Sequence, residues 1–122
     1  MPNDEQLEAL ELADQKDQIA YTRQLCERYL QNHPDHVPTL VTYARNLISL
    51  AQYSLAKAAL DHAQKIVSKK RLPLVLVQRG HLLEAQGAFS EAEAMYMEAH
   101  VLDPVDATYL IYAGSIIPSG CH

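Results

Sequence analysis

An apolar pattern that recurs roughly every 34 to 36 residues constrains the fold of this chain more than any other feature. Two stripes with the i, i+3, i+4, i+7 spacing of a helix face follow each other in its middle. They are Leu40, Tyr43, Ala44 and Leu47, then Ala56, Ala59, Leu60 and Ala63. The second stripe returns as Ala92, Met95, Tyr96 and Ala99, and the first returns as Leu76, Gly80 and Leu83. The pattern therefore predicts a helical hairpin that is repeated along the chain.

The offset between copies is about 34 residues, apart from about two extra residues in 67–72. The same offset carries Leu76, Gly80 and Leu83 onto Leu110, Gly114 and Ile117. We expect one domain, 1–122, with repeats at about 3–36, 37–72 and 73–106, a half repeat at 107–117 and a tail at 118–122. The predicted helices are 4–15, 18–32, 37–50, 53–67, 73–85, 89–102 and 107–117.

Residues at the predicted helix ends support this division. Pro34, and its counterpart two repeats later, follow predicted helix ends, where a residue without an N–H group can stop a helix at little cost. Asp35 and Asp106 are expected to offer oxygen acceptors near the next helix starts. Ser90 and Glu93 have the spacing of a capping box.

The stretch LVLVQRGHLLEAQGAFSEAEAMYMEAHVLDP, residues 74–104, resembles a tetratricopeptide repeat (TPR). The matching sites are Leu76, Gly80, Leu83, Gly87, Phe89, Ala92, Tyr96, Ala99 and Pro104. The resemblance implies an all-α fold of about seven helices, in which antiparallel hairpins stack as a right-handed superhelix. Gln6 and Thr22 depart from the family pattern, so we expect loose packing in the first copy; Arg79 stands where the pattern has Leu.

In TPR arrays the first helix of each hairpin lines a concave surface, which implies a groove that binds a peptide or helix of a partner protein. Here the groove residues would be Val41, Arg45, Ile48, Val77, His81 and Glu84. Arg45 would meet a carboxylate of the partner through paired N–H donors. The alternative is that these are ordinary half-packed or solvated positions. The clamp with which some family members bind chaperone C-termini is absent, because its sites hold residues such as Leu7, Glu11, Thr42, Leu74 and Gln78.

Charge and cysteine content limit the other classes of partner. The net charge of −5 disfavours nucleic acid and anionic membrane surfaces, and no apolar run is long enough to span a membrane. The acidic first residues do not resemble a targeting segment. Cys26 and Cys121 do not form a disulfide framework, so we expect a cytoplasmic protein with Cys26 as an inert buried thiol. His33 and His36 are better explained as turn residues than as zinc ligands.

The segment 107–122 contains no Asp, Glu, Lys or Arg. We expect its helix to dock on the helix at 89–102 through Leu110, Ala113, Gly114 and Ile117. The other face would then expose Tyr109, Tyr112 and Ile116, which predicts self-association, with a homodimer as one form. We expect a fragment of a longer array, or a truncated reading frame, as the origin of this uncharged ending, and self-association as its consequence; a disordered tail is the alternative.

The function predicted from these features is a non-catalytic scaffold for protein–protein interaction, without a cofactor or metal. One alternative is a recruitment arm, or a fragment, of a longer TPR-containing enzyme or of a secretion or assembly factor. A second is an RNA-binding helical repeat, which Glu11, Asp14 and Glu84 disfavour because such a groove should be basic.

Overall fold

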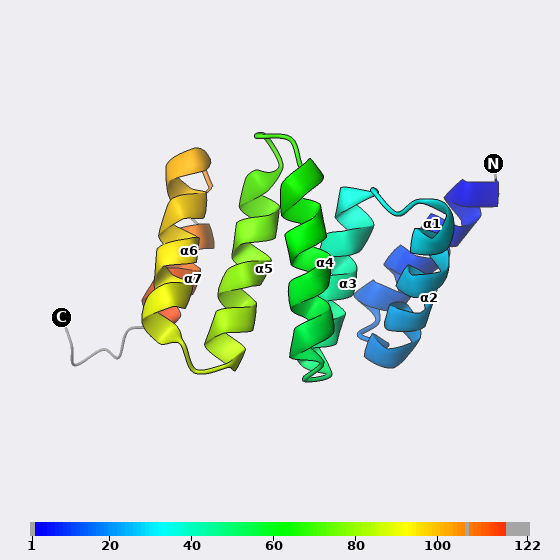
Figure 1. Cartoon of the computed structure of the whole chain (residues 1–122), viewed down its shortest axis with the longest axis horizontal. Coiled ribbons are helices and arrows are strands. Elements are labelled where there is room, and N and C mark those ends of the chain that lie inside the picture. Colours follow the sequence, from blue (N-terminus) through cyan, green and yellow to red (C-terminus); the bar gives the residue numbers. More distant parts are fainter. Residues whose placement is uncertain (1, 107, 117–122) are drawn as a thin grey trace. The chain divides into compact units, whose positions relative to one another are not determined.

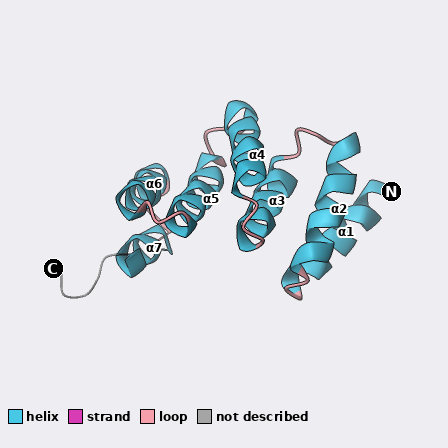
Figure 2. Cartoon of the chain, turned by 60° about the horizontal axis from the view of Figure 1, so that its bottom comes forward, coloured by secondary structure: helices cyan, strands magenta, loops and turns pink. Residues whose placement is uncertain are grey.

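The computed structural model describes residues 2–106 and 108–116, and the side chains of residues 5–106 and 108–114 (Figure 1). The described residues form seven α-helices and no strand, joined by short loops (Figure 2). The helices are α1 (Pro2–Gln15), α2 (Ile19–Asn32), α3 (Val37–Ser49), α4 (Tyr53–Ile66), α5 (Leu72–Ala85), α6 (Phe89–Leu102) and α7 (Thr108–Ile116). The predicted all-α fold of helical hairpins is therefore confirmed, and every helix end lies within two residues of its predicted position.

The turn inside each hairpin contains one residue in the left-handed region of backbone conformation. These residues are Asp17 (φ 56°), Ala51 (φ 60°) and Gly87 (φ 82°). In all three turns the next amide donates a hydrogen bond to the carbonyl five residues before it, which is the 6→1 bond of a Schellman motif. Only Gly87 adopts this conformation without steric strain. The same turn is therefore built with and without glycine.

The helices belong to two compact units, Met1–Ile66 and Val67–His122. In the first unit α1 packs on α2, α2 on α3 and α3 on α4. In the second unit α5 packs on α6, and α6 on α7. The prediction of a single domain stays a prediction.

Each hairpin contains a pair of corresponding register positions, one on each helix, at which the sizes of the two side chains compensate. The pairs are Leu10 with Cys26, Ala44 with Leu60, and Gly80 with Tyr96, and all six residues are buried. As the residue on the first helix becomes smaller, the residue on the second becomes larger. At Gly80 the fit is so close that an added Cβ atom would lie 2.4 Å from Cε1 of Tyr96. Complementary volume at this position therefore lets the two helices of each hairpin approach closely there.

The predicted caps are confirmed at only one of three sites. Asp106 accepts a hydrogen bond from the Thr108 N–H at 2.9 Å, and hydrogen bonds from the Thr108 side chain and backbone lower the pKa of its carboxyl group. Asp35 does not cap α3, because its Oδ1 lies 2.8 Å from Nε2 of His62. The capping box at Ser90 was also wrong. The tight turn at Gly87 starts α6 already at Phe89, which places Ser90 inside the first helical turn.

Candidate functional site

The exposed surface of α3 in the first unit carries three of the predicted groove residues. Val41 and Ile48 are half-buried, and the exposed Arg45 lies between them in the sequence. The Arg45 guanidinium donates to Oδ2 of Asp14, near the end of α1, and forms an ion pair with it. Asn46 donates to the other carboxylate oxygen of Asp14 at 3.2 Å. The Arg45 charge, which we expected to bind a carboxylate of the partner, is therefore already paired with Asp14.

A second polar cluster joins α2 to α3. Arg23 donates from Nη1 to both carboxylate oxygens of Glu27, at 3.1 and 3.0 Å, and the Tyr43 hydroxyl donates to Oε2 of Glu27 at 2.9 Å. Burial, together with the hydrogen bond to Glu27, raises the pKa of Tyr43 to about 12. These contacts orient α3, and with it the surface that carries Arg45.

Cys26 lies in the core of the first unit with Leu10 and Tyr29, and its thiol is free. Burial, reinforced by the nearby Asp14 carboxylate, raises the pKa of this thiol to about 12. A thiol that stays neutral at physiological pH is a poor nucleophile. The structure thus agrees with the prediction of an inert buried cysteine.

The predicted groove residues of α5 are partly inside the second unit. Val77 is buried in the core cluster with Tyr96, while His81 and Glu84 are half-buried. The Tyr96 hydroxyl donates to Oε1 of Glu84 at 2.9 Å, and Nδ1 of His81 lies 2.7 Å from the same hydroxyl oxygen. Because the tyrosine proton points to Glu84, His81 Nδ1–H is the donor to the hydroxyl. Burial, together with the bond to Glu84, raises the pKa of Tyr96 above its ordinary value.

An aromatic ring from α7 completes this cluster. The Tyr112 ring lies edge-on to His81, with centroids 4.9 Å apart, and 5.4 Å from the Tyr96 ring. Sequence reasoning placed His81 and Glu84 on a common face but missed Tyr96 and Tyr112 as their partners. The spacing between Gly80 and Tyr96 was the available signal, since a ring that packs on a glycine brings its hydroxyl near the next turn of the same helix.

The face of α7 that docks on the rest of the second unit differs from the predicted one. Tyr109 and Ala113 are buried at 6% and 4% exposure, and Tyr112 is half-buried against the same core cluster. Leu110 is 42% exposed, and Gly114 is exposed as well. The predicted docking of Ala113 is confirmed, whereas that of Leu110 and Gly114 was wrong. The prediction that Tyr109 faces solvent was also wrong, and Tyr112 is half-covered by the core cluster.

The repeat register supplies the reason for this difference. The repeat offset carries Leu110 and Gly114 back onto Leu76 and Gly80, which pack within their own hairpin against α6. The corresponding stripe of α7 is not the one that packs on α6; α7 docks on α6 with another face, which buries Tyr109 and Ala113. The side chain of Ile116, the third predicted self-association residue, lies outside the described residues, and so does Ile117.

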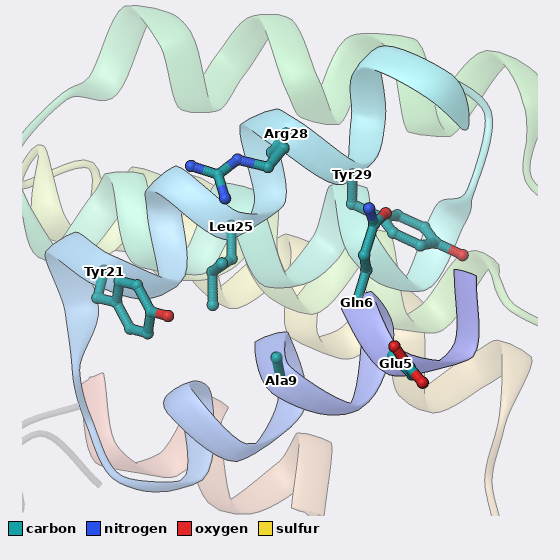
Figure 3. A pocket seen from close by; sticks show the side chains of 7 residues that line it. All are labelled: Glu5, Gln6, Ala9, Tyr21, Leu25, Arg28 and Tyr29. Atoms are coloured by element: carbon teal, nitrogen blue, oxygen red, sulfur yellow. The ribbon is translucent and has the colours of Figure 1, made fainter. Parts of the chain in front are cut away.

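A hollow of about 280 Å³ lies between α1 and α2 (Figure 3). Tyr21 and Leu25 extend from α2 towards α1 at this hollow, and Gln6 and Ala9 border it on α1. Glu5, Arg28 and Tyr29 complete the lining. Sequence reasoning did not name the hollow, but it expected loose packing because Gln6 stands where the family pattern has a large apolar residue. The location of the hollow agrees with that expectation.

The two histidines of the turn after α2 pack on one aromatic ring. His33 stacks on Tyr29 with centroids 4.4 Å apart, and His36 lies edge-on to it at 5.4 Å. Within the described residues no group of three His, Cys, Asp or Glu side chains could hold a metal ion. The same part of the chain contains no helix with the length and apolar character needed to cross a membrane.

No family model and no curated protein matches this chain. Among solved structures it is similar to the Arabidopsis OM64 TPR domain, with a TM-score of 0.80 and 18% sequence identity. The similarity covers 94% of this chain and 93% of that one. The chain therefore has the fold of a tetratricopeptide-repeat domain, in agreement with the resemblance of residues 74–104 to that repeat.

Proposed function

We propose that this protein is a non-catalytic interaction module that binds a segment of another protein on the first helices of its hairpins. The observation that carries this proposal is the TPR fold, because that fold presents side chains of successive first helices in a rigid arrangement. The surface of α3 in the first unit adds a specific chemical argument.

On α3 the half-buried Val41 and Ile48 offer apolar area, and Arg45 offers a guanidinium whose position is set by Asp14. The contact with Asp14 uses Nη2, whereas a guanidinium has five N–H donors in a planar fork. A partner carboxylate can therefore bind the same group from another side. We expect the partner segment to carry an apolar residue next to an acidic one. The apolar residue would contact Val41 and Ile48, and the acidic residue would bind the Arg45 guanidinium.

In the second unit we propose that His81 and Glu84 contact a partner through their half-exposed polar edges. Val77 is expected to contribute little, because it is already buried in the core. Because His81 and Glu84 are both tied to Tyr96, a partner would meet a surface with little side-chain freedom to lose.

Arg45→Glu tests the α3 surface, provided that a change in partner contact is separated from a change in the fold. The single variant places two carboxylates side by side, because Asp14 stays. The double variant Asp14→Lys with Arg45→Glu restores an ion pair in the opposite sense and serves as the matched control. We expect partners captured by the wild-type chain to be lost by both variants, while circular dichroism shows unchanged helicity. If the double variant regains the partners, or the single variant keeps them, the proposed α3 site is wrong.

The alternative roles differ in the surface that each of them requires. A recruitment arm within a longer TPR-containing enzyme, or a part of a secretion or assembly factor, would use the same surface. RNA binding would require a basic first-helix surface, whereas α3 shows an ion pair that is neutral overall. The absence of catalysis, cytoplasmic location and self-association stay predictions. Tyr109 is buried and Tyr112 half-buried, so the large apolar side chains that the described part of α7 leaves exposed are Leu110 and Ile111.

A further inference from the structure

The first helix of the third hairpin shows what normally covers the stripe that α7 exposes. In α5, Leu76 is 1% exposed and belongs to the core cluster that includes Tyr96 of α6. The place of a Cβ atom on Gly80 is occupied by the Tyr96 ring, at 2.4 Å. A second helix thus covers the Leu76 and Gly80 stripe and places an aromatic ring on the glycine.

The same stripe lies open on α7, one repeat later. Leu110, in the position of Leu76, is 42% exposed, and the neighbouring Ile111 is 67% exposed. A Cβ atom added to Gly114, in the position of Gly80, would have no atom of the described chain within 4 Å. α7 carries no charged residue that would favour contact with water. It is therefore a first helix whose hairpin face has no cover among the described residues.

The size compensation within the hairpins indicates what kind of side chain fits over Gly114. A large Leu10 is matched by a small Cys26, Ala44 by Leu60, and glycine by tyrosine. A glycine at this position therefore requires the largest counterpart. Glycine also weakens a helix relative to alanine, and no atom among the described residues makes it sterically necessary at Gly114. An aromatic ring that docks there would account for it.

Two of the three second helices, α4 and α6, also share the residues around this counterpart. α4 buries Ala56, Leu60 and Ala63, and α6 buries Ala92, Tyr96 and Ala99, so a small residue stands four positions before and three positions after the large one. The small residues allow the backbones to approach closely. A helix that is to cover α7 should repeat this spacing with an aromatic residue in the centre.

We propose that α7 is a docking site for an amphipathic helix of a partner protein that carries an aromatic residue between two small residues, with its ring seated on Gly114. The partner helix completes a fourth hairpin of the same construction as α5 and α6. This site is separate from the α3 surface, so either proposal can fail while the other holds.

A peptide with the sequence of residues 86–104, which contains α6, is a defined probe of this site. We would add it to the full chain labelled with nitrogen-15 and follow the amide signals of Gly114 and Gly80. Binding that shifts Gly114 and leaves Gly80 unchanged supports the proposal. A shift at Gly80 instead means that the peptide exchanges with α6, and no shift at either glycine means that α7 does not take such a helix. Both results overturn the proposal.

The role of the ring is tested by exchanging the sizes of the two side chains that are proposed to meet, one in the chain and one in the peptide. Neither exchange is expected to unfold the chain. Gly114→Ala should leave the chain folded, because no described atom is near and alanine favours helix. The wild-type chain should bind the tyrosine peptide roughly tenfold more tightly than the peptide with Tyr96→Leu, and Gly114→Ala should reverse this order. Equal preference in both chains would overturn the proposal. So would a Gly114 signal that shifts with protein concentration alone, because a second copy would then be the occupant.

Discussion

The hairpins α5/α6 and α1/α2 share one register but are packed very differently. In α5/α6 the Tyr96 ring sits directly on Gly80, and its hydroxyl is held by two polar side chains. In α1/α2 the corresponding pair is Leu10 and Cys26, and a hollow of about 280 Å³ bordered by Gln6 lies between the helices. The repeat therefore does not depend on one residue type at each position. What recurs is the combined volume of the pair at the helix contact.

The largest expected effect comes from removal of the ring. Tyr96→Ala should lower the free energy of unfolding by about 3–5 kcal/mol, because it leaves a cavity over Gly80 and removes the partner of His81 and Glu84. Urea denaturation would measure this change. Tyr21→Ala is the matched control in the loose hairpin, because Tyr21 is more than half exposed. A similar loss in both variants would mean that the two hairpins do not differ as described.

Alkaline pH should act on the loose hairpin first. The pKa of Cys26 is raised from 9.0 to about 12, so the folded state favours the neutral thiol. This contribution to stability is complete below pH 9.0 and is lost as the pH rises towards 12, because the unfolded chain ionises first. At about pH 10.5 the expected loss is about 2 kcal/mol. Between neutral pH and about pH 10.5, the free energy of unfolding of the Cys26→Ala variant should fall less than that of the wild-type chain. An equal fall in both would show that the Cys26 thiol is not its cause.

Gly80→Ala and Gly114→Ala should have opposite signs. At Gly80 the added methyl group meets the Tyr96 ring. The cost of this overpacking should exceed the gain in helix propensity, so the free energy of unfolding should fall by about 1–2 kcal/mol. At Gly114 the space is open, so the same substitution should raise stability by up to about 1 kcal/mol. Thermal unfolding of the two variants would measure both. Changes of the same sign would contradict the close contact at Gly80.

The smallest effect is expected where the loose hairpin can be improved. Gln6→Leu places an apolar side chain at the edge of the hollow and should raise the free energy of unfolding by about 0.5–1 kcal/mol. Gln24→Leu is the control, since Gln24 is exposed on α2 and does not line the hollow. Equal gains would show that helix propensity, and not the hollow, accounts for the effect.

Helical periodicity was sufficient to predict the elements of this fold. Apolar stripes and turn residues placed the helix ends within two residues, because both depend on local spacing. Caps were less predictable. α6 begins at Phe89, the start that the sequence pattern predicted, so Ser90 already lies inside the helix and Ala88 holds the cap position. The spacing of Ser90 and Glu93 alone does not show which residue holds that position.

The candidate site was predictable only in part, because it depends on contacts between helices. Arg45 was placed on the correct helix, but its ion pair with Asp14 joins residues far apart in the sequence. On α7, apolar residues occur all round the helix, so their pattern alone did not define the buried face. The repeat register contained the answer, since Leu110 and Gly114 correspond to Leu76 and Gly80.

The most direct test of complementary volume is a double-mutant cycle with Gly80→Ala and Tyr96→Leu, which converts the pair in α5/α6 into the pair found at Ala44 and Leu60. We expect the double variant to be more stable than the sum of the two single changes predicts, by at least about 1 kcal/mol in the free energy of unfolding. Additivity within about 0.5 kcal/mol would show that the two positions are independent, and would contradict the account.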